Sequence, residues 1–137
     1  MAQGADGLPE TVEEAIDAIE AGYDFMLAFA AQGREPERDD PMGIRGYLQR
    51  ACAGMDVLSA AKPSNLGVPN GPMADATEAM LKVMREDAAK ARAAFQFVLA
   101  QAAIGSQMID NLNASIHIRA LLTDVFLIDE SLKSANS

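Results

Sequence analysis

The residues best suited to chemistry lie along one edge of a helix expected near the C-terminus. Asp110, Asn113, His117 and Asp124 follow one another at intervals of three, four and seven residues, which sets them on one side of an α-helix. His117 is the only histidine of the chain, and a nearby carboxylate can hold an imidazole in one tautomer for acid or base chemistry. The simpler interpretation of the same edge is a histidine with one structural hydrogen bond.

Three further polar side chains could extend this edge into a pocket. Arg119 belongs to the same expected helix, and Tyr23 and Tyr47 lie on two earlier ones. Together with His117 and Asp124 they would form a polar binding site for a small molecule, of the kind in which a few polar groups converge on an otherwise apolar cavity. An enzyme or a ligand-binding bundle with this pocket is therefore the alternative hypothesis for function.

Other types of site are disfavoured by the sequence. The single cysteine, Cys52, excludes an internal disulfide and lies in an apolar helical pattern without a nucleophile motif. One histidine and one cysteine do not provide the usual ligands of a structural zinc ion, and the Glu-x-x-His pairs of di-iron bundles are missing from the sequence. We therefore expect no metal ion, no cofactor and no catalytic residue.

Composition narrows the classes of partner. The chain has 20 acidic and 11 basic residues, a net charge of -9, and such a surface repels nucleic acid and anionic membranes. No stretch approaches the ~20 uncharged apolar residues of a membrane span, and the first residues do not resemble a signal peptide. The expectation is a cytoplasmic protein with a flexible tail over residues 1–8 and a single helical domain over residues 9–137.

Amphipathic periodicity predicts an all-α fold, an antiparallel up-down four-helix bundle with helices over residues 11–32, 41–61, 72–104 and 106–133. Thr11 and Glu14 fit a capping box at the start of the first helix, and Gly33 fits a helix end. Asp40 and Ser106 are the expected N-caps of the second and fourth helices. The charged segment over residues 34–40 is expected to be a solvated loop.

Three of the four expected helices carry a second apolar stripe. In a bundle one apolar face per helix is enough, so the surplus predicts a homodimer in which small residues allow close approach and aromatic residues anchor the contact. The predicted interface comprises Ala18, Gly22, Phe25, Phe29, Phe97 and Ile104.

The preferred hypothesis is thus a non-enzymatic homodimer that acts by binding, as a scaffold, adaptor or small-ligand carrier. Its expected partners are a second copy of the chain and either another protein or a small ligand.

Overall fold

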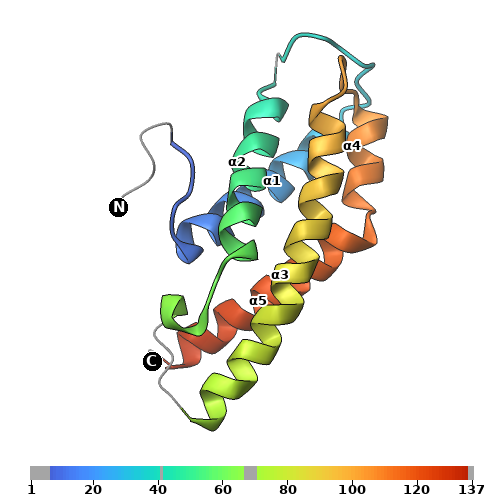
Figure 1. The fold of residues 1–137 in the computed structure, drawn as a ribbon. Helices are drawn as coiled ribbons and strands as arrows, with labels where there is room; N and C mark the ends of the chain where they lie inside the picture. Colours follow the sequence, from blue (N-terminus) through green and yellow to red (C-terminus); the bar gives the residue numbers. More distant parts are fainter. Residues whose placement is uncertain (1–6, 41, 67–70, 136–137) are drawn as a thin grey trace.

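The computed structural model describes residues 7–40, 42–66 and 71–135, with side chains as far as residue 131. The helices in these ranges are α1 (Val12–Ala30), α2 (Ile44–Ser59), the 3₁₀ helix η1 (Pro63–Leu66), α3 (Pro72–Leu99), α4 (Ser106–Asn113) and α5 (Ile116–Ala135) (Figure 1). The predicted all-α class is confirmed. The four-helix bundle is not, because the described residues form five α-helices.

Two predicted features fall partly outside these ranges. The tail expected over residues 1–8 is described only at Gly7 and Leu8, and Pro41, the expected first residue of the second helix, is not described.

The start of α1 follows the predicted capping box. The Glu14 backbone N–H donates to Thr11 Oγ1 at 3.1 Å, and Glu14 Oε1 accepts from the backbone N–H groups of Glu10 and Thr11 at 3.0 and 3.3 Å. This arrangement satisfies amides that have no partner inside the helix. At the other end Gly33 adopts the left-handed conformation, with φ of 62°, as its place just past the helix predicted.

α1 and α2 approach each other closely through glycine. A Cβ atom on Gly54 of α2 would lie 2.9 Å from the Ala15 carbonyl oxygen of α1, and one on Gly22 of α1 would lie 3.3 Å from the Ala51 Cβ atom. A Cβ atom on Gly54 would be too close to the α1 backbone, and one on Gly22 would require its neighbour to move by a few tenths of an ångström. Small residues on both helices therefore serve packing inside one chain.

α2 starts later than predicted. Gly43, with φ of 73°, occupies the N-cap position, and Ile44 is the first helical residue. Asp40 is therefore not the N-cap, although its Oδ1 atom still accepts from the Arg45 backbone N–H at 3.3 Å. The left-handed turn at glycine lets the chain enter the helix three residues after the expected cap.

α3 ends at Leu99, five residues before the predicted end. The Arg45 guanidinium of α2 donates to the carbonyl oxygens of Leu99 and Gln101 at 3.0 and 2.7 Å. Carbonyls at a helix C-terminus lack intrahelical donors, so this arginine stabilises the end of α3 and ties it to the start of α2.

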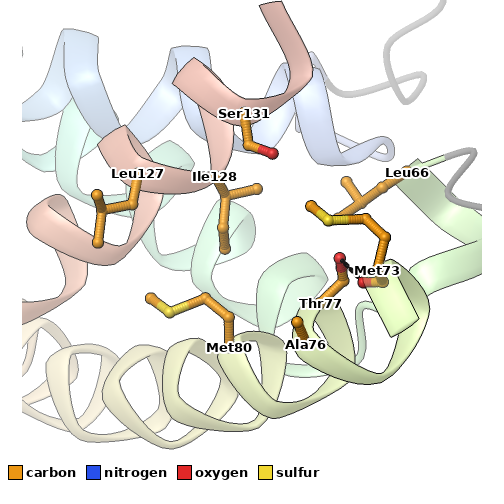
Figure 2. A pocket seen from close by; sticks show the side chains of 8 residues that line it. All are labelled: Leu66, Met73, Ala76, Thr77, Met80, Leu127, Ile128 and Ser131. Carbon is orange, nitrogen blue, oxygen red and sulfur yellow. Dashed lines mark hydrogen bonds between the residues drawn. The ribbon is translucent and has the colours of Figure 1, made fainter. Parts of the chain in front are cut away.

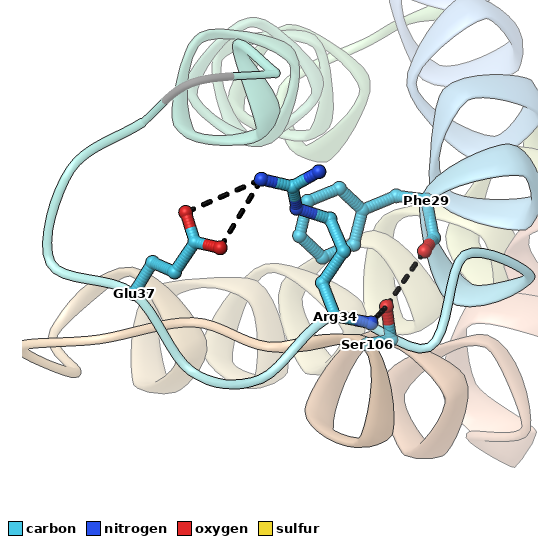
Figure 3. Close-up of polar contacts among 4 residues, drawn as sticks. All are labelled: Phe29, Arg34, Glu37 and Ser106. Atoms are coloured by element: carbon cyan, nitrogen blue, oxygen red, sulfur yellow. Dashed lines mark hydrogen bonds and ion pairs between the residues drawn. The ribbon is translucent and has the colours of Figure 1, made fainter.

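The charged segment after α1 is not a free loop, because it pairs with the segment that leads into α4 (Figure 3). Glu37 and Ile104 exchange two backbone hydrogen bonds of 3.4 and 3.1 Å. Ser106 Oγ accepts from the Arg34 backbone N–H at 2.7 Å and donates to the Phe29 carbonyl oxygen at 2.8 Å. Ser106 is thus the first residue of α4, after Gly105 as N-cap, and its hydroxyl joins two segments instead of capping the helix.

The largest correction concerns the predicted helix over residues 106–133, which is divided into α4 and α5. Ala114 closes α4, and the Ser115 hydroxyl accepts from the His117 backbone N–H at 3.3 Å, while the Ser115 carbonyl accepts from the Arg119 N–H. Serine competes for backbone groups in this way at helix starts. The break redirects the chain, so α4 packs on α1 whereas α5 packs on α3.

Apolar side chains from all five α-helices form one core. α2 lies between α1 and α3, and α3 is the main packing partner of α5 (Figure 1). Arg92 and Arg85 mark where α3 runs beside α2: Arg92 pairs with Asp56, and Arg85 donates to the Ala61 carbonyl at 2.8 Å. The N-terminal part of α3 extends past the end of α2 and lies beside η1 and α5 (Figure 1).

Candidate functional site

The five residues of the hypothetical pocket are not brought together. Tyr47 stacks on Phe25 with ring centroids 4.1 Å apart and carries the Arg50 guanidinium over its other side, so it belongs to the contact of α1 with α2. Tyr23 is half-buried on α1, whereas His117 and Arg119 are exposed on α5. Neither α1 nor α2 is a main packing partner of α5.

The polar edge that suggested the pocket is divided by the break before α5. Asp110 and His117 are exposed, while Asn113 and Asp124 are buried. Neither amide atom of Asn113 has a hydrogen-bond partner within the described part of the protein. Only Asp124 combines burial with a second ionisable group.

The predicted dimer interface is also divided. Gly22, Phe29 and Ile104 are buried in the core of the single chain, so they have no surface to offer a second copy. Phe25 is covered by Tyr47, and Ala18 is half-buried on α1. Phe97 differs from the others, because 67% of its surface is exposed.

The single cysteine is buried and unreactive at neutral pH. Cys52 is buried within α2, and this burial raises the pKa of its thiol to about 11. The thiol therefore stays protonated at neutral pH.

α3 and α5 run side by side in opposite directions. Near the start of α3, Thr77 and Met80 share a pocket with Ile128 and Ser131 of α5. Two turns further along α3, Asp87 interacts with Asp124, which precedes Ile128 by one turn. Residue numbers thus rise along one helix as they fall along the other, and this register places two carboxyl groups face to face.

Asp124 is the most perturbed acid of the described residues. It is only 7% exposed, its Oδ2 atom has no hydrogen-bond partner, and the Asp87 side chain of α3 lies close enough to raise its pKa. Two carboxyl groups can share a hydrogen bond only when one holds a proton. Burial raises the pKa of Asp124 from 3.8 to about 7, and the hydrogen bond and charge of Asp87 act in the same direction.

One turn of α5 from Asp124, and two turns of α3 from Asp87, the two helices leave an apolar groove of about 140 Å³. Figure 2 shows side chains of α3 and α5 facing each other across it, with Leu66 of η1 at one end. Its lining is Leu66, Met73, Ala76, Thr77, Met80, Leu127, Ile128 and Ser131. Apart from two hydroxyls, the lining is apolar.

Exposed apolar residues extend the groove along both helices. At about 100° per residue, Val83, Ala94 and Phe97 continue the side of α3 that carries Ala76, and the half-buried Asp87 and exposed Lys90 lie on the same side between Val83 and Ala94. On α5 the side that carries Leu127 continues through Ile116, Ala120 and Thr123. We call this strip the α3–α5 face, and its large exposed members are Met73, Val83, Phe97, Ile116 and Leu127.

The described residues contain neither a cluster of metal-ligating side chains nor a membrane-spanning helix. No three histidine, cysteine, aspartate or glutamate side chains among them gather as metal ligands would. Their helices also lack a stretch long and apolar enough to cross a bilayer.

Comparisons of the chain with protein-family models, with curated proteins and with solved structures found no match.

Proposed function

We propose that the protein acts by binding, and that it self-associates through the α3–α5 face. The observation that carries this proposal is the row of large apolar side chains left exposed on that face, with Phe97, Ile116 and Leu127 each more than half exposed. Exposed apolar residues that gather on one side of a protein often mark a site of protein association. Scaffold, adaptor or carrier roles are all compatible with this surface.

A second copy is the favoured occupant for reasons of shape. The small residues Ala76, Ala94 and Ala120 lie among the larger ones and would allow helices of two copies to approach closely. When a two-fold axis relates two copies, the antiparallel pair of α3 and α5 in one copy packs on the same pair in the other. The four helices then bury the apolar side of both pairs.

Charge supports the same occupant. α3 has four basic and four acidic residues, and α5 has two basic and three acidic ones. The two helices together therefore have a net charge of -1, against -9 for the whole chain. Two copies can therefore meet across this face with little repulsion, although the protein as a whole is acidic.

Size-exclusion chromatography with light scattering tests the proposal at high micromolar concentration. We expect a dimer for the natural protein, and monomers for Phe97→Asp and for Leu127→Asp, because a charge on the α3–α5 face resists burial. Gln49→Asp, an equal change of charge at an exposed position of α2, should leave the dimer intact.

Helical circular dichroism of each variant separates lost association from lost folding. A monomeric natural protein, or variants at Phe97 and Leu127 that dimerise as well as the Gln49 variant, would contradict the proposal.

A further inference from the structure

We propose that docking of a second copy on the α3–α5 face is coupled to proton uptake by the Asp87–Asp124 carboxyl pair, which makes self-association pH-sensitive. This inference rests on the function proposed above and concerns its regulation. The carboxyl pair belongs to the same two helices as the face, with Asp124 one turn and Asp87 two turns from the apolar groove.

Geometry makes the pair dependent on a proton. Asp124 is buried, its Oδ2 atom has no donor, and the group it meets across the helix contact is a second acid. When both groups are ionised, like charges oppose each other between α3 and α5. When Asp124 is protonated, its hydroxyl can donate to Asp87 and hold the two helices together.

Other charged groups near the pair offer limited compensation. On α3, Lys90 follows Asp87 by three residues and is exposed, and Glu86 precedes it on the outer side. On α5, His117 lies two turns before Asp124 and is exposed, while the residues three and four positions away are Ala120, Leu121, Leu127 and Ile128.

The elements behind the pair add no buried cation. Among the described residues of α1, α2 and α4, Glu14 is the one buried charged side chain, and it accepts hydrogen bonds from the backbone N–H groups of Glu10 and Thr11. The proton itself is therefore the main means of neutralising the pair.

A docked copy would increase this dependence. It would cover the α3–α5 face and remove water from the half-buried Asp87, which makes ionisation of both carboxyl groups more costly, although Lys90 on the same side of α3 acts in the opposite direction. Because linkage is reciprocal, a state that binds the proton more tightly is itself favoured by protonation. Self-association should strengthen as the pH falls.

The test is the dimer dissociation constant measured by analytical ultracentrifugation between pH 6 and pH 8.5. For the natural protein we expect the dissociation constant to rise at least about tenfold from pH 6 to pH 8.5, since one linked proton changes an equilibrium constant by up to about tenfold per pH unit. Asp124→Asn keeps a hydrogen-bond donor toward Asp87 but cannot ionise, and its dissociation constant should change less than about threefold.

Asp87→Asn serves as a second variant should the first fail to fold, and it should also flatten the pH dependence. Asp110→Asn, at an exposed position of α4, is the matched control and should behave as the natural protein does. A natural dimer whose dissociation constant stays level over this range overturns the coupling and leaves the proposed self-association standing. A full pH dependence retained in both pair variants also overturns it. Monomers at every pH overturn both.

Discussion

Replacement of Asp124 by asparagine should change how folding stability depends on pH. In the folded protein the pKa of Asp124 is raised to about 7, against 3.8 as its ordinary value. The folded state therefore binds the proton more tightly than the unfolded state, and stability is greatest at low pH and falls as the pH rises from about 4 through 7. At 1.36 kcal/mol per pKa unit, complete ionisation costs ~4 kcal/mol.

Asp124→Asn cannot ionise, and its amide can still donate to Asp87. Its stability relative to the parent protein should therefore grow by up to ~4 kcal/mol between pH 4 and pH 8. The assay is urea denaturation followed by circular dichroism, at a fixed concentration and in the Phe97→Asp background, so that association does not contribute.

Asp110→Asn provides the control for loss of one negative charge at an exposed position. A constant difference in unfolding free energy between Asp124→Asn and its parent from pH 4 to pH 8 would refute the reasoning, because it would mean that Asp124 ionises alike in both states.

Three further predictions concern the fold and use urea denaturation at pH 7. Gly54→Ala should cost ~1–3 kcal/mol, because the added Cβ would lie 2.9 Å from the Ala15 carbonyl oxygen; an unchanged midpoint would show that α1 and α2 separate easily. Ser106→Ala should cost ~1–3 kcal/mol by leaving two backbone partners unpaired, and an equal loss in Ser106→Thr, which keeps the hydroxyl, would point to packing instead. Thr11→Ala should cost ~1 kcal/mol and Thr11→Ser close to nothing, whereas equal losses would contradict a capping role.

Local signals explain which parts of the fold could be predicted. The capping box at Thr11, the left-handed Gly33 and Pro72 at the first turn of α3 act through a few neighbouring residues, and the structure confirms each of them. The all-α class follows in the same way from apolar periodicity.

Helix ends set by distant contacts could not be predicted. α3 stops at Leu99, where Arg45 donates to the carbonyl oxygens of Leu99 and Gln101, and Ile104 then pairs with Glu37. The signal for the break between α4 and α5 was present in Ser115 but is weak beside the apolar stripes that run through it. A helix N-cap such as Ser115 contributes only ~1 kcal/mol, which is too little to decide between one long helix and two shorter ones. The packing of α4 on α1 and of α5 on α3 decides it.

The candidate site shows the same division. The sequence by itself determined the helical class, the surplus of apolar surface and the polar character of Asp124. Tertiary structure decided that Phe29 and Ile104 are core residues, that Phe97 is exposed, and that Asp124 faces Asp87 and not His117. Periodicity states how much apolar surface a helix has, but only the packing of neighbouring helices determines which part of it stays in water.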